Sequence, residues 1–277
     1  MTDSTARAAM IESEAGDVVV DSVTDLPPDA SGSIAVTGSH GGTYSTATAA
    51  GRGVRAAVFN DAGFGLADAG VAGVLAATYP AVAVDHRSAR IGEGAQSLDG
   101  VVSCANAAAA RLGIVVGDVV RRVLPLLRTA ESAEAGDPPQ APAVRYLFAG
   151  RRAVIALDSA SQITAEHAGA FAALGSHGAA PGNDPRRALR HPVAFAAFND
   201  AGRGRDDAGI GRLALLDGVG IPAVTVGHDS ARIGDGRSTL VDGRVSAVNA
   251  TAAAAGARIG QPLIDLYARV GLAPVST

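Results

Sequence analysis

The sequence predicts an α/β fold made by internal duplication, with two similar βαβ-type repeats and mainly parallel sheet. First, Ser-Ala-Arg-Ile-Gly-Glu-Gly at residues 88–94 recurs as Ser-Ala-Arg-Ile-Gly-Asp-Gly at residues 230–236. Second, Gly-Ser-His-Gly and Phe-Asn-Asp-Ala-Gly precede it in both copies, in the same order. Third, short apolar runs alternate with helix-compatible stretches rich in small residues. That alternation is typical of βαβ units, and repetition of whole motif series indicates duplication.

The first repeat is expected to span residues 17–127. Val18–Val20 is predicted to be a buried strand that ends at Asp21, because three β-branched residues precede polar ones. By the same reasoning, strands are expected at 34–37, 55–59 and 81–84, and a short strand or helix entry at 100–106. Helices are expected over 44–50, 66–78 and 117–127.

The second repeat, residues 153–277, restates these elements with only short insertions between motifs. Residues 128–152 have few large apolar side chains at their start and contain Pro138-Pro139, which favours a linker. Residues 1–16 are polar, small and acidic, so a flexible arm is expected. This arm lacks the basic start and apolar centre of a signal peptide.

The composition excludes several classes of protein. The 277 residues carry a net charge of −4, so nothing favours nucleic acid or an anionic membrane as a partner. No apolar run approaches the roughly 18 residues that span a bilayer. The single cysteine, Cys104, excludes an intramolecular disulfide and a cysteine-cluster metal site. These absences favour a cytoplasmic protein that binds a small molecule, with a homo-oligomer as an open alternative.

All 23 basic residues are arginine. Without lysine the chain cannot form a Schiff base, attach pyridoxal phosphate or provide a P-loop lysine. There is also no Gly-x-Gly-x-x-Gly after a strand, so a nicotinamide site lacks its usual sign. The cofactor stays unknown, with a divalent transition metal as one alternative.

Polar residues follow the predicted strand ends in both repeats, where ligands bind in open parallel sheets. Asp21 and Asp158 are in such positions. The residues that we assign to catalysis are His40, His177, Asp61, Asp200, His86 and His228, which are also the candidate metal ligands. The residues that we assign to substrate binding are Ser39, Ser176, Asn60, Asn199, Ser88, Ser230, Arg90 and Arg232.

Each motif suggests a role and has a structural alternative. In Gly-Ser-His-Gly, flexible backbone amides can face an anion while histidine acts as acid, base or ligand; the alternative is a tight turn. In Asn-Asp-Ala-Gly, a carboxylate can orient a histidine or cap a helix. In Ser-Ala-Arg-Ile-Gly, arginine can hold a carboxylate, or pair with Glu93 or Asp235 to fix the loop.

We therefore expect a hydrolase, with or without a metal, that acts on a small, polar, anionic substrate with a C–N or C–O bond. One alternative is a non-catalytic protein that binds or senses a small anion. A further alternative is a lyase or isomerase acting on a hydroxy acid. The duplicated motifs are equally compatible with one composite site and with two separate sites.

Overall fold

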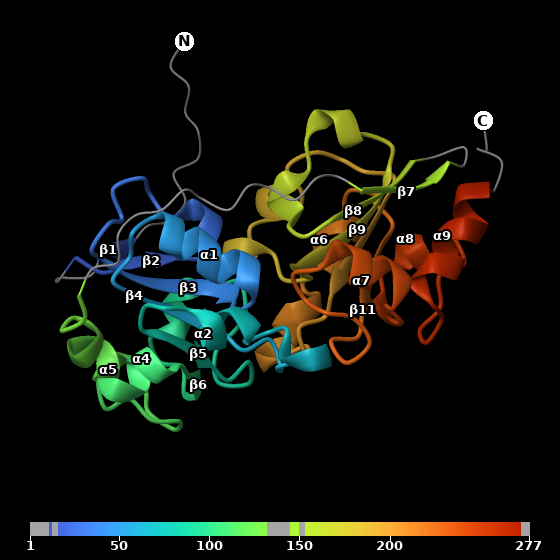
Figure 1. The fold of residues 1–277 in the computed structure, drawn as a ribbon. Coiled ribbons are helices and arrows are strands. Elements are labelled where there is room, and N and C mark those ends of the chain that lie inside the picture. The colour runs from blue at the N-terminus through green and yellow to red at the C-terminus, as the bar shows by residue number, and fades with distance from the viewer. Residues whose placement is uncertain (1–10, 13–15, 132–144, 150–152, 273–277) are drawn as a thin grey trace, which may run out of the picture.

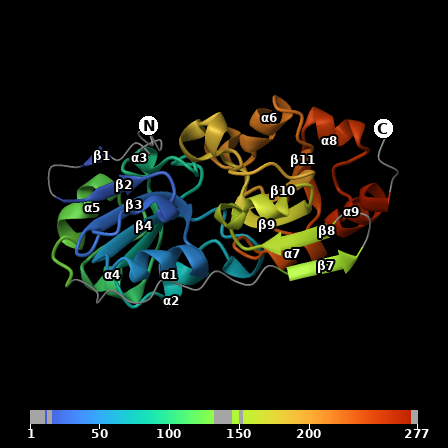
Figure 2. The ribbon, with the colours of Figure 1, turned by 90° about the horizontal axis from the view of Figure 1, so that it is seen from above.

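The computed structural model describes residues 11–12, 16–131, 145–149 and 153–272, and it confirms the duplicated α/β architecture. The two halves lie side by side, each with its own sheet (Figures 1 and 2). Each sheet has six strands in chain order, β1-β2-β3-β4-β5-β6 and β12-β11-β10-β9-β8-β7. The four middle strands of each sheet are parallel to one another, and the two edge strands are antiparallel.

The strands of the first half are β1 (Ile11–Glu12), β2 (Val18–Val20), β3 (Ile34–His40), β4 (Ala56–Asn60), β5 (Ala81–Val84) and β6 (Val102–Ala105). Its helices are α1 (Thr43–Gly51), α2 (Ala72–Ala76), α3 (Gly94–Ser97), α4 (Ala107–Arg111) and α5 (Val120–Leu127). The strands of the second half are β7 (Arg145–Ala149), β8 (Ala153–Leu157), β9 (Phe171–His177), β10 (Phe195–Asn199), β11 (Ala223–Val226) and β12 (Val245–Val248). Its helices are α6 (Arg212–Asp217), α7 (Gly236–Val241), α8 (Ala250–Ala254) and α9 (Leu263–Leu272).

Both faces of each sheet are buried, which is why the strands read as continuous apolar runs. Alternate residues of the first sheet point to opposite faces. Val36 and Val58 belong to a core cluster shared with α4 and α5, whereas Ala35 and Ala57 belong to one shared with α1 and α2. Phe195 packs against α8 and α9 in the second half in the same way. Within the described part of the chain, no helix has the length and apolar character needed to cross a bilayer.

Three segments differ from the sequence prediction. The helix expected over 66–78 is wrong in its first half, because Ala67 and Asp68 have φ of 55° and 52° and only α2 is α-helical. Strand β1 lies within the expected flexible arm and pairs with β2. Strand β7 lies within the expected linker, where its backbone adds an edge to β8. Residues 1–10 and 13–15 of that arm, and residues 132–144 and 150–152 of that linker, lie outside the described residues.

The halves pack through reciprocal contacts that define a pseudo-twofold axis. The Leu66 amide donates to the carbonyl of His228 at 2.7 Å, and the Arg205 amide donates to the carbonyl of His86 at 2.8 Å. The apolar cluster between the halves contains paired residues from both, including Ala62 and Ala201. Because each contact occurs twice, the duplication extends to the interface as well as to the two sheets.

Candidate functional site

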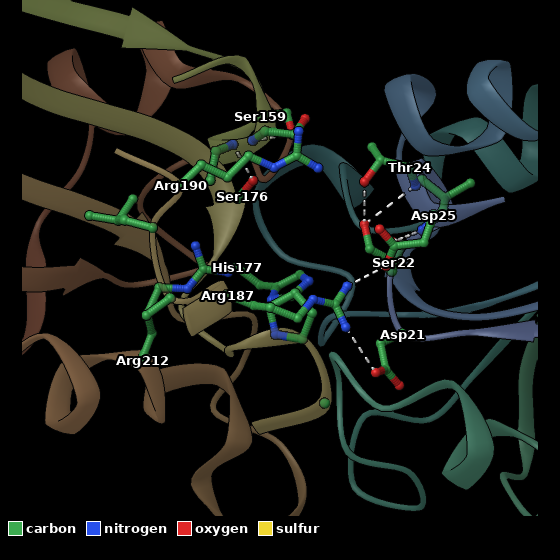
Figure 3. Close-up of a pocket in the computed structure, with 18 of the residues that line it drawn as sticks. Asp21, Ser22, Thr24, Asp25, Ser159, Ser176, His177, Arg187, Arg190 and Arg212 are labelled. Atoms are coloured by element: carbon green, nitrogen blue, oxygen red, sulfur yellow. Dashed lines mark hydrogen bonds and ion pairs between the residues drawn. The ribbon is translucent and has the colours of Figure 1, made fainter. Parts of the chain in front are cut away.

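A cavity of about 570 Å³ lies between the two halves, beside the carboxyl ends of β2, β3, β8 and β9. Both halves therefore line one pocket, which we call the central pocket (Figure 3). It is defined by Asp21, Ser22, Thr24, Asp25, Ser39, His40, Tyr44, Ser45, Asp158, Ser159, Ser161, Ser176, His177, Asp184, Arg186, Arg187, Arg190 and Arg212, together with smaller neighbours.

His40 and His177 end β3 and β9 and are 6% and 7% exposed. Burial lowers the pKa of His40 to about 4. Burial first, then the charge of Arg212 and the Coulomb interaction with the neighbouring His40, hold the pKa of His177 well below 6.5. Both rings are therefore neutral near pH 7. The lowered pKa of each ring argues against a protonated histidine as the anion-binding charge.

The glycines of Gly-Ser-His-Gly bring the neighbouring loop close to the strand. A Cβ on Gly38 would lie 2.4 Å from the Glu93 nitrogen, and a Cβ on Gly175 would lie 2.5 Å from the Asp235 nitrogen. Only glycine permits this approach, at which the Gly92 amide donates to the Gly38 carbonyl at 2.7 Å. These glycines serve close packing, and neither has the positive φ on which an anion-binding bend was expected to depend.

Ser39 and Ser176 line the central pocket, but their hydroxyl oxygens are already engaged. Ser39 Oγ accepts a hydrogen bond from the Val23 amide at 2.9 Å, and Ser176 Oγ accepts one from the Ala160 amide at 2.8 Å. These bonds hold the loops that follow β2 and β8, which carry Asp21 and Asp158. The two serines thus position the pocket wall.

Arg212, the first residue of α6, is 3% exposed and lines the central pocket. Its Nε and one terminal nitrogen donate to the Ala179 carbonyl at 3.2 and 2.6 Å, and its guanidinium lies 4.6 Å from the centre of the Phe198 ring. No carboxylate of the described residues lies within 4.0 Å of it. Burial and the nearby Arg187 lower the pKa of Arg212 to about 9, so it stays charged at neutral pH.

The chain between β9 and β10 differs from its counterpart in the first half. It forms two short 3₁₀ turns, Pro181–Asn183 and Pro185–Arg187, where the first half has α1. Arg187 extends from this segment to the first half, where it is 3.1 Å from Asp21 and also pairs with Asp25 (Figure 3). Arg190 lines the pocket beside Ser159 and Ser176, and among the described residues it forms no ion pair (Figure 3).

Asp61 and His86 lie outside the central pocket, as do Asp200 and His228. Asp61 Oδ1 accepts hydrogen bonds from the His86 amide at 3.0 Å and approaches His86 Nδ1 at 2.9 Å. The Asp200 carboxylate contacts His228 in the same way, at 2.9 and 3.2 Å. Each ring packs on the glycine turn of the opposite half, at Gly202 and Gly63 respectively. These four residues therefore join the halves.

One group of side chains is close enough to hold a metal ion: the ligand atoms of Asp61, Asp85 and His86 lie within 4.8 Å of one another. However, Asp61 Oδ1 already accepts two amide hydrogens. The second half also has Gly227 where the first has Asp85, so this group is not duplicated. The donor set fits an interface hydrogen-bond network better than a metal site.

The remaining candidates in these motifs also have structural partners. Asn60 donates to the Ala89 carbonyl at 3.1 Å, and Asn199 donates to the Ala231 carbonyl at 2.9 Å. The hydroxyl groups of Ser88 and Ser230 each link two backbone segments. All four side chains fix the Ser-Ala-Arg-Ile-Gly loop and lie outside the central pocket.

The two arginines of that motif behave differently. Arg90 pairs with Glu93 at 2.9 Å and approaches Asp206 of the other half at 3.7 Å. Arg232 is exposed, and Asp235 accepts a hydrogen bond from the Ser238 amide instead of pairing with it. Neither arginine lines the central pocket, so the loop-fixing alternative describes Arg90.

The sequence analysis missed the pocket arginines. Arg187, Arg190 and Arg212 all lie in the second half, in segments where the repeats differ. Residues shared by the two repeats gave no sign of these arginines, because the matching positions of the first half are not arginine; helix α2, the counterpart of α6, contains no charged residue. Comparisons of the chain with protein-family models, with curated proteins and with solved structures gave no match.

Proposed function

We propose that the protein binds a small anionic molecule in the central pocket, through an arginine group supplied by the second half. Arg212 carries this proposal: it is a buried guanidinium without a carboxylate within 4.0 Å among the described residues. Burying an unpaired charge is costly, and a bound carboxylate or phosphate supplies the missing negative charge.

Three further features support an anionic ligand. Arg190 lines the same wall and has no ion-pair partner among the residues described. The N-terminus of α1 reaches the pocket at Tyr44 and Ser45, and no side chain caps its first amides. The free amides of a helix N-terminus favour negative charge. The volume of about 570 Å³ suits a small metabolite.

Binding is tested by isothermal titration calorimetry and thermal shift with inorganic phosphate and with small mono- and dicarboxylates. Wild type is expected to bind at least one of these anions, and Arg212→Gln is expected to weaken binding by tenfold or more. Arg203→Gln is the matched control, because Arg203 is 47% exposed, pairs with Asp207 and lies outside the pocket. Equal anion affinities in both variants and wild type would contradict the proposal.

Catalysis on the bound molecule is the second candidate, favoured by the two buried neutral histidines. The sequence favoured hydrolysis of a C–N or C–O bond. In the described residues, however, no hydroxyl of the pocket is hydrogen-bonded to His40 or His177, as an activated serine nucleophile would be. This argues against a histidine-activated serine; hydrolysis by an activated water and lyase or isomerase chemistry on a hydroxy acid fit the arrangement equally well. A cytoplasmic location, suggested by the composition, is part of the same proposal.

A further inference from the structure

The N-terminus of α1 reaches the central pocket with free amide groups. The amide of its N-cap residue, Gly42, is engaged, because it donates to His40 Nδ1 at 3.1 Å. The next three amides, of Thr43, Tyr44 and Ser45, have no hydrogen-bond partner among the described residues. Tyr44 and Ser45 line the pocket. These amides form a group of donors at the positive end of the helix dipole.

The Ser45 side chain is an independent sign of a ligand at this place. It is 3% exposed, and its hydroxyl group has no hydrogen-bond partner in the part of the chain that the structure describes. By contrast, the hydroxyl groups of Thr46 and Thr48 donate to carbonyls of the preceding turn. The Ser45 oxygen is not sealed within the protein, because this residue lines the pocket. Buried hydroxyl groups are normally hydrogen-bonded, so an oxygen of a bound molecule would supply the missing acceptor.

The second half has no such group of amides at the matching place. After the shared Gly-Ser-His-Gly, its chain enters a short 3₁₀ turn that begins at Pro181, which has no amide hydrogen. The next amide, of Gly182, donates to the Gly92 carbonyl of the first half at 2.8 Å. An anion that binds to free amides can therefore do so only on the wall that the first half forms.

Arg212 occupies the corresponding place in the second half. In the first half, the Val74 amide of α2 donates to the Gly41 carbonyl at 3.0 Å. The Arg212 amide of α6 donates to the matching Gly178 carbonyl at 2.7 Å, so an arginine replaces an apolar side chain. Its guanidinium then reaches the carbonyl of Ala179, the residue that matches the N-cap of α1. Each half therefore presents positive charge close to its pocket histidine, as amides in the first half and as a guanidinium in the second.

We propose that the N-terminus of α1 is a second anion subsite, and that the ligand carries two anionic groups. One group binds to Arg212, and the other binds to the free amides and the Ser45 hydroxyl of α1. The ligand class is a small dicarboxylate, or a carboxylate that also carries a phosphate or phosphonate. The halves form opposite walls of the pocket, with Arg212 on one side and Ser22 and Thr24 on the other (Figure 3). The Arg212 subsite is that of the proposed function, on which this part of the inference rests.

The aspartates of the pocket leave both subsites available to an anion. Asp21 and Asp25 both pair with Arg187, and Asp158 accepts a hydrogen bond from the Gly236 amide at 3.0 Å. Helix α1 itself contains no acidic residue. Among the residues described, no carboxylate bonds to the free amides of α1 or to the guanidinium in α6.

Isothermal titration calorimetry on the full chain compares dianions with monoanions that have a methyl group in place of the second anionic group. The pairs are malonate or phosphonoacetate with propionate, succinate with butyrate, and glutarate with pentanoate. At least one dianion is expected to bind about tenfold or more tightly than its partner, with one molecule per chain. Equal affinities within every pair would overturn the second subsite and leave the proposed function standing. Absence of any anion binding would instead contradict the proposed function.

Ser45→Asp places a negative charge at the second subsite, at a helix position where aspartate is favourable. It is expected to remove the preference for dianions. Ala47→Asp is the matched control and should keep that preference, because Ala47 is half-buried on the same helix, points away from Ser45 and lies outside the pocket. Ser45→Ala removes only the hydroxyl group and should reduce the preference about threefold. Arg212→Gln should weaken both members of each pair. An unchanged preference in Ser45→Asp and Ser45→Ala would overturn the second subsite.

Discussion

Replacing Asp61 with alanine tests whether one buried carboxylate holds the interface between the halves. Its side chain is 2% exposed, and Oδ1 accepts hydrogen bonds from the amides of Gly63 and His86 at 2.9 and 3.0 Å. A fully buried donor left without a partner costs about 1–3 kcal/mol. Both of these hydrogen bonds are part-buried, so we expect Asp61→Ala to lower the free energy of unfolding by roughly 2–4 kcal/mol, a large part of a typical stability of about 5–15 kcal/mol.

Asp61→Asn refines the test, because the amide oxygen can replace Oδ1 while the negative charge is lost. Hydrogen bonds to charged groups exceed neutral ones by about 1 kcal/mol each, so a loss of about 2 kcal/mol is expected. Urea denaturation followed by circular dichroism measures both variants. Asp99→Ala is the control, because that carboxylate is 67% exposed and pairs only with Arg121 among the described residues. A loss below about 1 kcal/mol in Asp61→Ala would refute the reasoning.

Three further predictions concern backbone and charge. Ala67→Gly should stabilise the protein by about 0.5–1 kcal/mol in urea denaturation, because Ala67 is exposed and has a φ of 55°, which glycine adopts without strain. The control is Ala95→Gly in helix α3, which should destabilise the protein. Gly175→Ala should cost several kcal/mol or prevent folding, since its Cβ would lie 2.5 Å from a backbone nitrogen; normal expression and melting temperature would contradict this. The hydrogen bond to Asp200 raises the pKa of His228 above 6.5, so this pair stabilises the fold fully below pH 6.5 and less as pH rises through the raised pKa. Melting curves of wild type should show that loss, and His228→Gln should lack it.

The sequence was sufficient to predict the duplication and the main strands, because both sheet faces are buried and turn-forming residues separate the apolar runs. Among the site candidates, His40, His177, Ser39 and Ser176 line the central pocket. The expected helix over 66–78 failed because Ala67 and Asp68 adopt left-handed backbone at the contact between halves. Local propensity contains no information about such a contact.

The remaining candidates of the repeated motifs lie outside the central pocket, for a definite physical reason. A residue shared by both repeats can serve a site or the interface that both repeats form with each other. Asp61, His86 and their counterparts in the second half belong to that interface. Asn60 and Ser88 fix the loop beside it. The presence of the same residue in both repeats does not distinguish these two roles, because a ligand site and a symmetric interface both require the same residue type in each copy.

The pocket arginines could not be predicted by comparing the repeats. Arg212 begins α6, while the matching helix of the first half contains only small and apolar residues. Arg187 and Arg190 lie in the segment that takes the place of α1. Their convergence depends on how one half packs against the other, which no pattern along the chain specifies.

The two halves contact each other reciprocally, through the Leu66 amide and the His228 carbonyl and through the Arg205 amide and the His86 carbonyl. An isologous dimer interface has this form, but here both sides belong to one chain. In a homodimer with such an interface, any change to a pocket residue appears twice. Two copies joined in one chain are free of this constraint, and the arginines confined to the second half are changes that a homodimer cannot acquire on one side alone.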